Sequence, residues 1–171
     1  MDVLGPHSGE PPEAGSSGRG FRGYGPTVLD HFENPRNVGE IDNPEGESWV
    51  ESQAHGDRLK LTLRIAEGVV TEARFRAFGC GAAIASSSMA TVLLTGRGIE
   101  EASRLTRREV AEALGGLPES KVHCSVLAEE AVRLALEDYR RRRGAPGACP
   151  SNGIVARHAR RAGGKERDPK V

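Results

Sequence analysis

The chain has 171 residues, 24 Lys and Arg against 24 Asp and Glu, and three cysteines. This length fits one well-cored domain. The near-neutral charge argues against nucleic acid as a partner, and no apolar run approaches the length of a membrane span, which argues against a membrane partner. Three widely spaced cysteines make a poor disulfide framework, so we expect a reducing, cytoplasmic location.

The two ends of the chain differ in composition from the middle. Residues 1–23 are rich in Gly, Pro and Ser and lack a signal-peptide pattern, which predicts a disordered N-terminal leader. Residues 144–171 return to Gly, Pro, Arg and Lys and contain Cys149, which predicts a disordered basic tail. The ordered domain is therefore expected over residues 24–143.

The first predicted element is a short helix over Pro26–Phe32. Proline is favoured in a first helical turn, and Asn34-Pro35 ends the helix because proline disfavours the α region for the residue before it. Val28, Leu29 and Phe32 form its apolar face, which leaves His31 on the face expected to be exposed. Residues 36–47 are predicted to be a loop.

Two strands with clear alternation follow. Apolar residues alternate with polar ones over residues 59–65 and again over 73–77, and Glu67-Gly68 between them is typical of a hairpin turn. Residues 48–53 form a weaker adjoining strand. This pattern predicts an antiparallel sheet with one buried and one exposed face.

Three helices are predicted in the second half of the domain. The first covers residues 82–94, and its serine run is interpreted as a tight packing or solvated face. A capping box over Thr106–Glu109 opens the second helix, which reaches Leu114. The last helix runs from near Ser120 to about Arg142, and its buried stripe is expected at Ala128, Val132, Ala135 and Tyr139.

Candidate metal ligands occur at three separated points. These are His55 and Asp57 in a glycine-containing loop, Cys80 between Gly79 and Gly81, and the adjacent His123 and Cys124. Thiolate, imidazole and carboxylate are ligands of zinc and of iron–sulfur centres. Both cysteines are expected near helix N-termini, where the dipole lowers a thiol pKa. Without a C-x-x-C pair, spacing alone leaves a metal site and inert buried cysteines as alternatives.

Three longer stretches carry a resemblance to a known family. From Tyr24 to about Arg143 the chain resembles the U-type iron–sulfur cluster scaffolds, which include IscU and the N-terminal domain of NifU. The stretches are DHFENPRNVG at residues 30–39, FGCGAAIASSS at residues 78–88 and HCSVLAE at residues 123–129. The resemblance implies an α+β fold in which helices pack on one side of a three-stranded antiparallel sheet.

The resemblance also implies a function and a set of site residues. Members are scaffolds or carriers rather than turnover enzymes. They build a [2Fe–2S] cluster from iron and from sulfur supplied by a cysteine desulfurase, and they transfer it to apo iron–sulfur proteins. Cys80 and Cys124 correspond to cluster ligands, with His123 nearby and Asp57 as a labile extra ligand. Cys124 also corresponds to the persulfide acceptor. The chain has no large insertion between Cys80 and Cys124, and in this respect it resembles IscU and NifU more than the zinc-dependent SufU branch.

The sequence departs from the family pattern at two places. His55 stands where the family has its first cysteine. Imidazole ligates iron in Rieske centres and also suits zinc, so His55 remains a candidate ligand for either metal. The alternative function is therefore a Zn²⁺-binding sulfur-relay or regulatory partner of a desulfurase, and a third is a metal-free interaction protein. Residues 117–121 read LPESK where the family has LPPVK, which argues against handover through an Hsp70-type chaperone.

Overall fold

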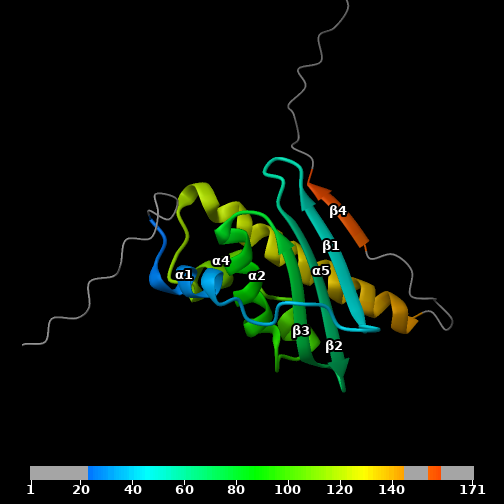
Figure 1. Cartoon of the computed structure of the whole chain (residues 1–171). Coiled ribbons are helices and arrows are strands. Elements are labelled where there is room, and N and C mark those ends of the chain that lie inside the picture. Colours follow the sequence, from blue (N-terminus) through cyan, green and yellow to red (C-terminus); the bar gives the residue numbers. More distant parts are fainter. Residues whose placement is uncertain (1–22, 145–153, 159–171) are drawn as a thin grey trace, which may run out of the picture.

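The computed structural model describes residues 23–144 and 154–158 and has an α+β architecture (Figure 1). Within these residues the strands have the spatial order β3-β2-β1-β4. The elements in chain order are α1 (Pro26–Glu33), β1 (Gly46–Ser52), β2 (Arg58–Ala66), β3 (Val69–Phe78), α2 (Gly81–Leu94), α3 (Ile99–Ala102), α4 (Arg107–Ala113), the 3-10 helix η1 (Glu119–Lys121), α5 (Val122–Gly144) and β4 (Ile154–His158).

Strands β1, β2 and β3 form the predicted antiparallel sheet. Leu61 pairs with Ser48 on one side and with Phe75 on the other, and the β2–β3 turn places Glu67 and Gly68 at positive φ. The predicted alternation is confirmed, because the four apolar side chains of β2 are buried while their polar neighbours face the other way. These buried residues are Leu59, Leu61, Leu63 and Ile65.

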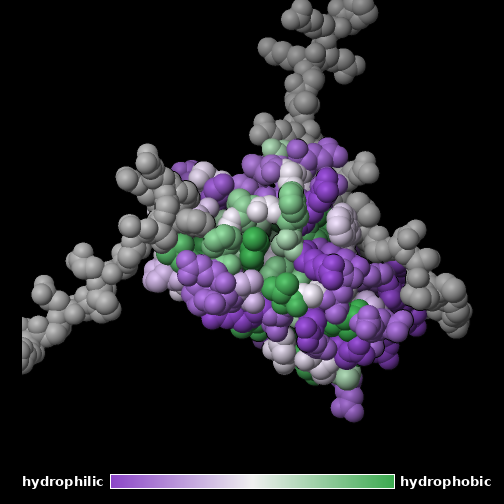
Figure 2. All heavy atoms as spheres, viewed as in Figure 1, coloured by the Kyte–Doolittle hydropathy of each residue, from purple (hydrophilic) through white to green (hydrophobic). Residues whose placement is uncertain are grey.

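The outer face of this sheet is partly covered by the segment before β1. This segment crosses in front of the strands in Figure 1, and its Ile41 N–H donates to Thr62 Oγ1 at 3.1 Å. Thr62 is therefore buried although it belongs to the polar side of the alternation. Figure 2 shows hydrophilic residues gathered over the strands on this side, where ion pairs such as Lys60–Glu40 at 2.6 Å lie.

A fourth strand extends the sheet beyond β1. β4 runs parallel to β1, from the pair Ser48–Ile154 to the pair Ser52–His158. The composition of residues 144–171 predicts a disordered tail here, so this strand differs from the expectation. Main-chain pairing at a sheet edge depends little on side-chain pattern, so a five-residue strand leaves a weak sequence signal. The rest of the predicted tail, including Cys149, and residues 1–22 of the predicted leader lie outside the described residues.

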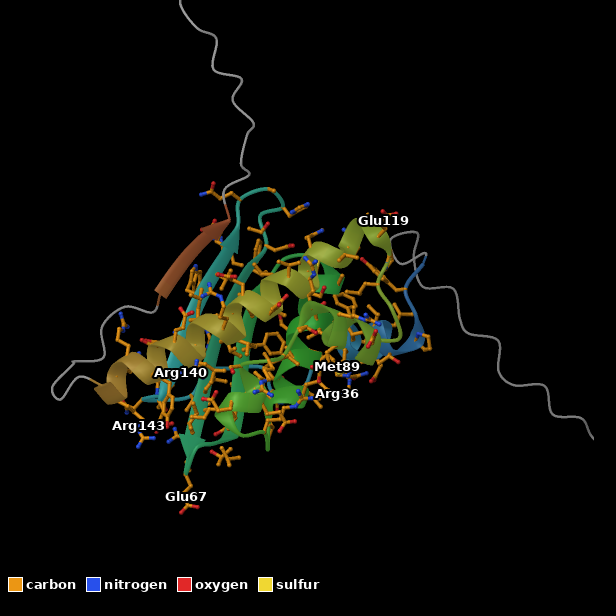
Figure 3. The ribbon with its side chains drawn as sticks, turned by 180° about the vertical axis from the view of Figure 1, so that it is seen from behind. Arg36, Glu67, Met89, Glu119, Arg140 and Arg143 are labelled. Carbon is orange, nitrogen blue, oxygen red and sulfur yellow. The ribbon has the colours of Figure 1, made fainter. Side chains whose placement is uncertain are left out.

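Helices α2 and α5 pack against the inner face of the sheet and enclose the core. Figure 3, seen from behind, shows α5 crossing the strands, with Arg140 and Arg143 near its end and Glu119 beyond its start. The predicted stripe of α5 is confirmed as buried, and Thr106 Oγ1 accepts the expected capping bond from the N–H of Glu109 at 3.2 Å. No helix among the described residues is long and apolar enough to cross a membrane.

The prediction for His31 is wrong. Its side chain is only 6% exposed, because α1 lies along α2 and turns this residue toward the buried serine run. His31 Nδ1 lies 2.8 Å from Ser88 Oγ, which also accepts the N–H of Arg36 at 2.8 Å. Burial lowers the pKa of His31, which favours the neutral ring. The serine run therefore serves as a polar packing face, as expected.

A buried carboxylate fastens α5 to β1. Asp138 is fully buried, and its Oδ2 accepts the N–H of Glu47 at 3.1 Å and pairs with Arg142 Nε at 2.8 Å. Ser48 Oγ adds a hydrogen bond to the carbonyl of Ala131 at 2.7 Å, one strand residue further along. These contacts fix the direction of α5 and therefore the position of its first turn.

We predict that Asp138→Ala lowers the free energy of unfolding by about 3 kcal/mol, because the N–H of Glu47 and the Nε of Arg142 both lose the buried carboxylate that they bind. Urea unfolding measures this loss. Glu137→Ala is the matched control, since it removes an exposed carboxylate from the same helix and is expected to cost less than about 0.5 kcal/mol. Equal losses in the two variants would contradict the anchoring role of Asp138.

Candidate metal centre

Three segments meet at the end of the sheet where α5 begins. They are the β1–β2 loop, the junction of β3 and α2, and the first turn of α5. In the loop, Ser52 C=O accepts the N–H groups of His55 at 3.3 Å and Gly56 at 2.8 Å, while Ser52 N–H donates to the carbonyl of Asp57 at 2.8 Å. Gly56 has φ +71°, which allows this tight reversal. The loop thereby turns Asp57 inward.

Asp57 connects the loop to the β3–α2 junction. Its side chain is buried, and its Oδ1 accepts the N–H of Cys80 at 3.1 Å. The carboxylate lies directly over Gly79, where a Cβ atom would approach Asp57 Cγ to 2.9 Å. Gly79 is therefore required for the close approach of Asp57. The sequence alone did not predict this role for Gly79.

The two described cysteines face each other across this junction. Cys80 Sγ lies 3.5 Å from Cys124 Sγ, and the Cys124 thiol points to Asp57 Oδ2 at 4.0 Å. Two thiolates on one tetrahedral zinc, with bonds of about 2.3 Å, would lie about 3.8 Å apart. The observed separation is close to this value. The sulfurs are therefore placed to share one metal atom with little rearrangement.

His123 completes a compact group of donors. Its Nε2 lies 3.5 Å from Asp57 Oδ2. One ligand atom each from Asp57, His123 and Cys124 can be chosen so that all three lie within 4.8 Å of one another. The group therefore contains predicted ligands from the loop and from α5. Cys80 is next to it, because its Sγ contacts Cys124 Sγ.

His55 lies beside this group rather than in it. Its exposed ring stacks on His123, with a centroid separation of 3.6 Å and an interplanar angle of 8°. Its Nδ1 lies 3.3 Å from Ser52 Oγ, a contact that sequence reasoning missed although Ser52 precedes His55 by three residues. Parallel rings direct their in-plane lone pairs in parallel, so in this arrangement the two imidazoles do not converge on one ion.

The electrostatics of Cys124 differ from the sequence expectation. Burial raises the pKa of this thiol, and the neighbouring Cys80 and Asp57 raise it further, so the expected helix-dipole effect does not dominate. Burial also lowers the pKa of His123, and His55 adds to this effect. Without a metal, these shifts favour the protonated thiol of Cys124 and the neutral ring of His123. A metal would have to displace the thiol proton in order to bind.

The fold and the donor group define a class: an α+β domain with a compact group of side chains that could hold a metal ion at one end of its sheet. Residues 23–146 match the family described as the NifU-like N terminal domain. The chain belongs to this family.

Curated relatives and solved structures agree with this assignment. The chain is 48% identical over 121 residues to an iron–sulfur cluster assembly scaffold protein of Archaeoglobus fulgidus, covering 71% of this chain and 79% of the relative. It is 46% identical over 125 residues to the scaffold protein IscU of Azotobacter vinelandii, covering 71% and 97%. The N-terminal NifU-like crystal structure from Brucella abortus shares the fold, with a TM-score of 0.56 at 19% identity over 68% of this chain and 94% of that one.

We predict that Gly79→Ala lowers stability by about 1–3 kcal/mol, because the new methyl group collides with the Asp57 carboxylate. It should also weaken metal binding by displacing that carboxylate. Thermal unfolding and titration with Zn²⁺ measure the two effects. Gly144→Ala is the control, since nothing lies within 4 Å of its added Cβ atom and it lies at the end of α5, where Ala is tolerated. A Gly79→Ala variant as stable as the Gly144→Ala variant would contradict this account.

Proposed function

We propose that this protein is an iron–sulfur cluster assembly scaffold that holds a nascent cluster at the Cys80–Cys124 centre and passes it to apo-proteins. One observation carries the proposal: two thiols 3.5 Å apart border a carboxylate and an imidazole at one end of the domain. Relatives of which the chain covers most of the length are named as such scaffolds. Here the cluster is cargo, so the chain supplies ligands and need not turn over a substrate.

The proposed ligands follow from the geometry. Cys80 and Cys124 provide two thiolates, which are the ligands that iron–sulfur clusters prefer. Asp57 and His123 provide an oxygen and a nitrogen donor within reach of Cys124. Asp57 Oδ1 already accepts the N–H of Cys80. If Asp57 binds the metal through Oδ2, this hydrogen bond to Cys80 is kept. A carboxylate that has this second partner is suited to act as a labile ligand.

The proposed sulfur acceptor is Cys124, and the sulfur donor is a cysteine desulfurase. The thiol of Cys124 loses its proton as the donor approaches, and over the whole step this proton passes to the departing cysteine of the donor. The resulting thiolate attacks the outer sulfur of the donor's persulfide. The new bond forms to Cys124 Sγ, and the donor's cysteine leaves as thiolate. Conversion of that sulfur to cluster sulfide requires two electrons from an external reductant.

We propose that His55 becomes a ligand by rotating away from His123. The resemblance aligns it with the family's first cysteine. Its ring is exposed, and its polar contact to Ser52 Oγ is long at 3.3 Å. Little therefore holds the ring in its stacked position. An imidazole in place of an anionic thiolate makes the ligand set less negative, which raises the reduction potential of a bound cluster.

The second candidate function is a zinc-binding sulfur-relay or regulatory partner of a desulfurase. The observation that favours it is the same compact group, because one carboxylate, one imidazole and two thiolates can form a closed tetrahedral zinc site. In this function the metal stays bound, and the ligands do not exchange it for iron.

Anaerobic reconstitution with iron, cysteine and a desulfurase tests the scaffold function. We expect the visible absorption of a [2Fe–2S] centre, and its loss by more than about tenfold in Cys80→Ser and in Cys124→Ser, because each removes a thiolate ligand. Cys149→Ser is the matched control, since it removes a thiol that the resemblance does not place among the ligands, and it should retain full absorption. A colourless protein that keeps zinc would support the second function instead.

Replacing His55 tests its role as a ligand. We expect His55→Ala to shorten the lifetime of the reconstituted cluster. We expect His55→Cys to restore or extend this lifetime and to shift the reduction potential down by about 100 mV or more, because thiolate replaces imidazole. Absorption decay and redox titration measure these effects. A His55→Ala cluster with unchanged lifetime and potential would show that His55 is not a ligand.

A further inference from the structure

The strand β4 is an addition to the part of the chain that matches the family. The match ends at residue 146, and β4 covers Ile154–His158. Without this strand, β1 would be an edge strand of the sheet. Strand edges and the loops that follow them open more easily than paired strands. Pairing with β4 is therefore expected to make the end of β1, and the loop that follows it, open less easily.

What β1 supports is the loop of the metal centre. The pairing with β4 continues to the very end of β1, where Ser52 is in register with His158. Ser52 is also the residue that closes the loop, through the N–H groups of His55 and Gly56 and the carbonyl of Asp57. One residue thus joins the C-terminal strand to the loop that carries two of the proposed ligands.

We propose that β4 is a positioning element of the metal centre, which holds the end of β1 and thereby keeps the His55–Asp57 loop closed. When β4 is paired, the end of β1 has β2 on one side up to Glu51 and β4 on the other side up to Ser52, so the loop starts from a fixed strand end. When β4 leaves, the end of β1 becomes an open edge and the loop bonds to Ser52 open more often. The C-terminal segment can in this way control how firmly Asp57 and His55 are presented to a metal.

The role in metal binding rests on the proposed function, but the coupling itself is measurable in the metal-free chain. Val155→Pro and Ala156→Pro break the strand in the full-length protein. Successive peptide groups of a strand point to opposite edges, so at least one of the two variants removes an N–H that faces β1. Ala162→Pro is the matched control, because it makes the same substitution beyond β4.

Amide hydrogen exchange at His55 and Gly56 is the first measurement. We expect the more disruptive of the two variants to speed exchange at both amides about tenfold, which corresponds to the loss of roughly one hydrogen bond. The amide of Phe75, which donates to the carbonyl of Asn37 at 3.0 Å, reports on the rest of the sheet and should be unaffected. Ala162→Pro should leave all three amides unchanged.

Titration of the same proteins with Zn²⁺ is the second measurement. We expect the variant with the faster loop exchange to bind Zn²⁺ about tenfold more weakly than Ala162→Pro. Unchanged exchange at His55 and Gly56 in both strand variants would overturn the proposal, as would equal acceleration at Phe75 or unchanged Zn²⁺ affinity despite faster exchange. Failure of the unaltered chain to bind any metal would instead count against the proposed function, while the exchange result would still test the coupling.

Discussion

The structure of the candidate metal centre depends on the carboxylate of Asp57. It comes from the β1–β2 loop, accepts the N–H of Cys80 at the start of α2, and faces Cys124 and His123 in the first turn of α5. Three segments that are far apart in sequence are therefore joined through one side chain. Because Gly79 has no side chain, the Asp57 carboxylate can approach the β3–α2 junction closely. Asp138 fixes α5 against β1, and this places the first turn of α5 beside Asp57.

Under the proposed scaffold function, this arrangement is suited both to holding a cluster and to releasing it. Cys124 is buried and its pKa is raised, which favours the less reactive protonated thiol until a partner or a metal reaches it. Cys80 and His55 lie nearer the surface, where ligands can exchange. Asp57 has a structural partner of its own, so it can bind and leave without loosening the fold. A scaffold needs this combination, because its cargo must be held and then given up.

The sequence predicted the antiparallel strands and the long helices because their patterns are local: alternation in β2, the capping box at Thr106 and the stripe of α5. The resemblance predicted the cysteines that meet. The tertiary contacts could not be predicted from the sequence. His31 is buried because of how α1 meets α2, and burial outweighs the helix dipole at Cys124. The stacking of His55 on His123 and the pairing of β4 arise between segments far apart in the chain, where no local pattern records them.

The metal and sulfide content of the protein purified without oxygen tests the central claim most directly. If the Cys80–Cys124 centre holds an iron–sulfur cluster, iron and acid-labile sulfide will be present in about equal amounts, as in a [2Fe–2S] centre, and both will be lost from Cys124→Ser. Zinc bound at about one ion per chain, without sulfide and without exchange for iron, would contradict the scaffold function and favour a closed zinc site.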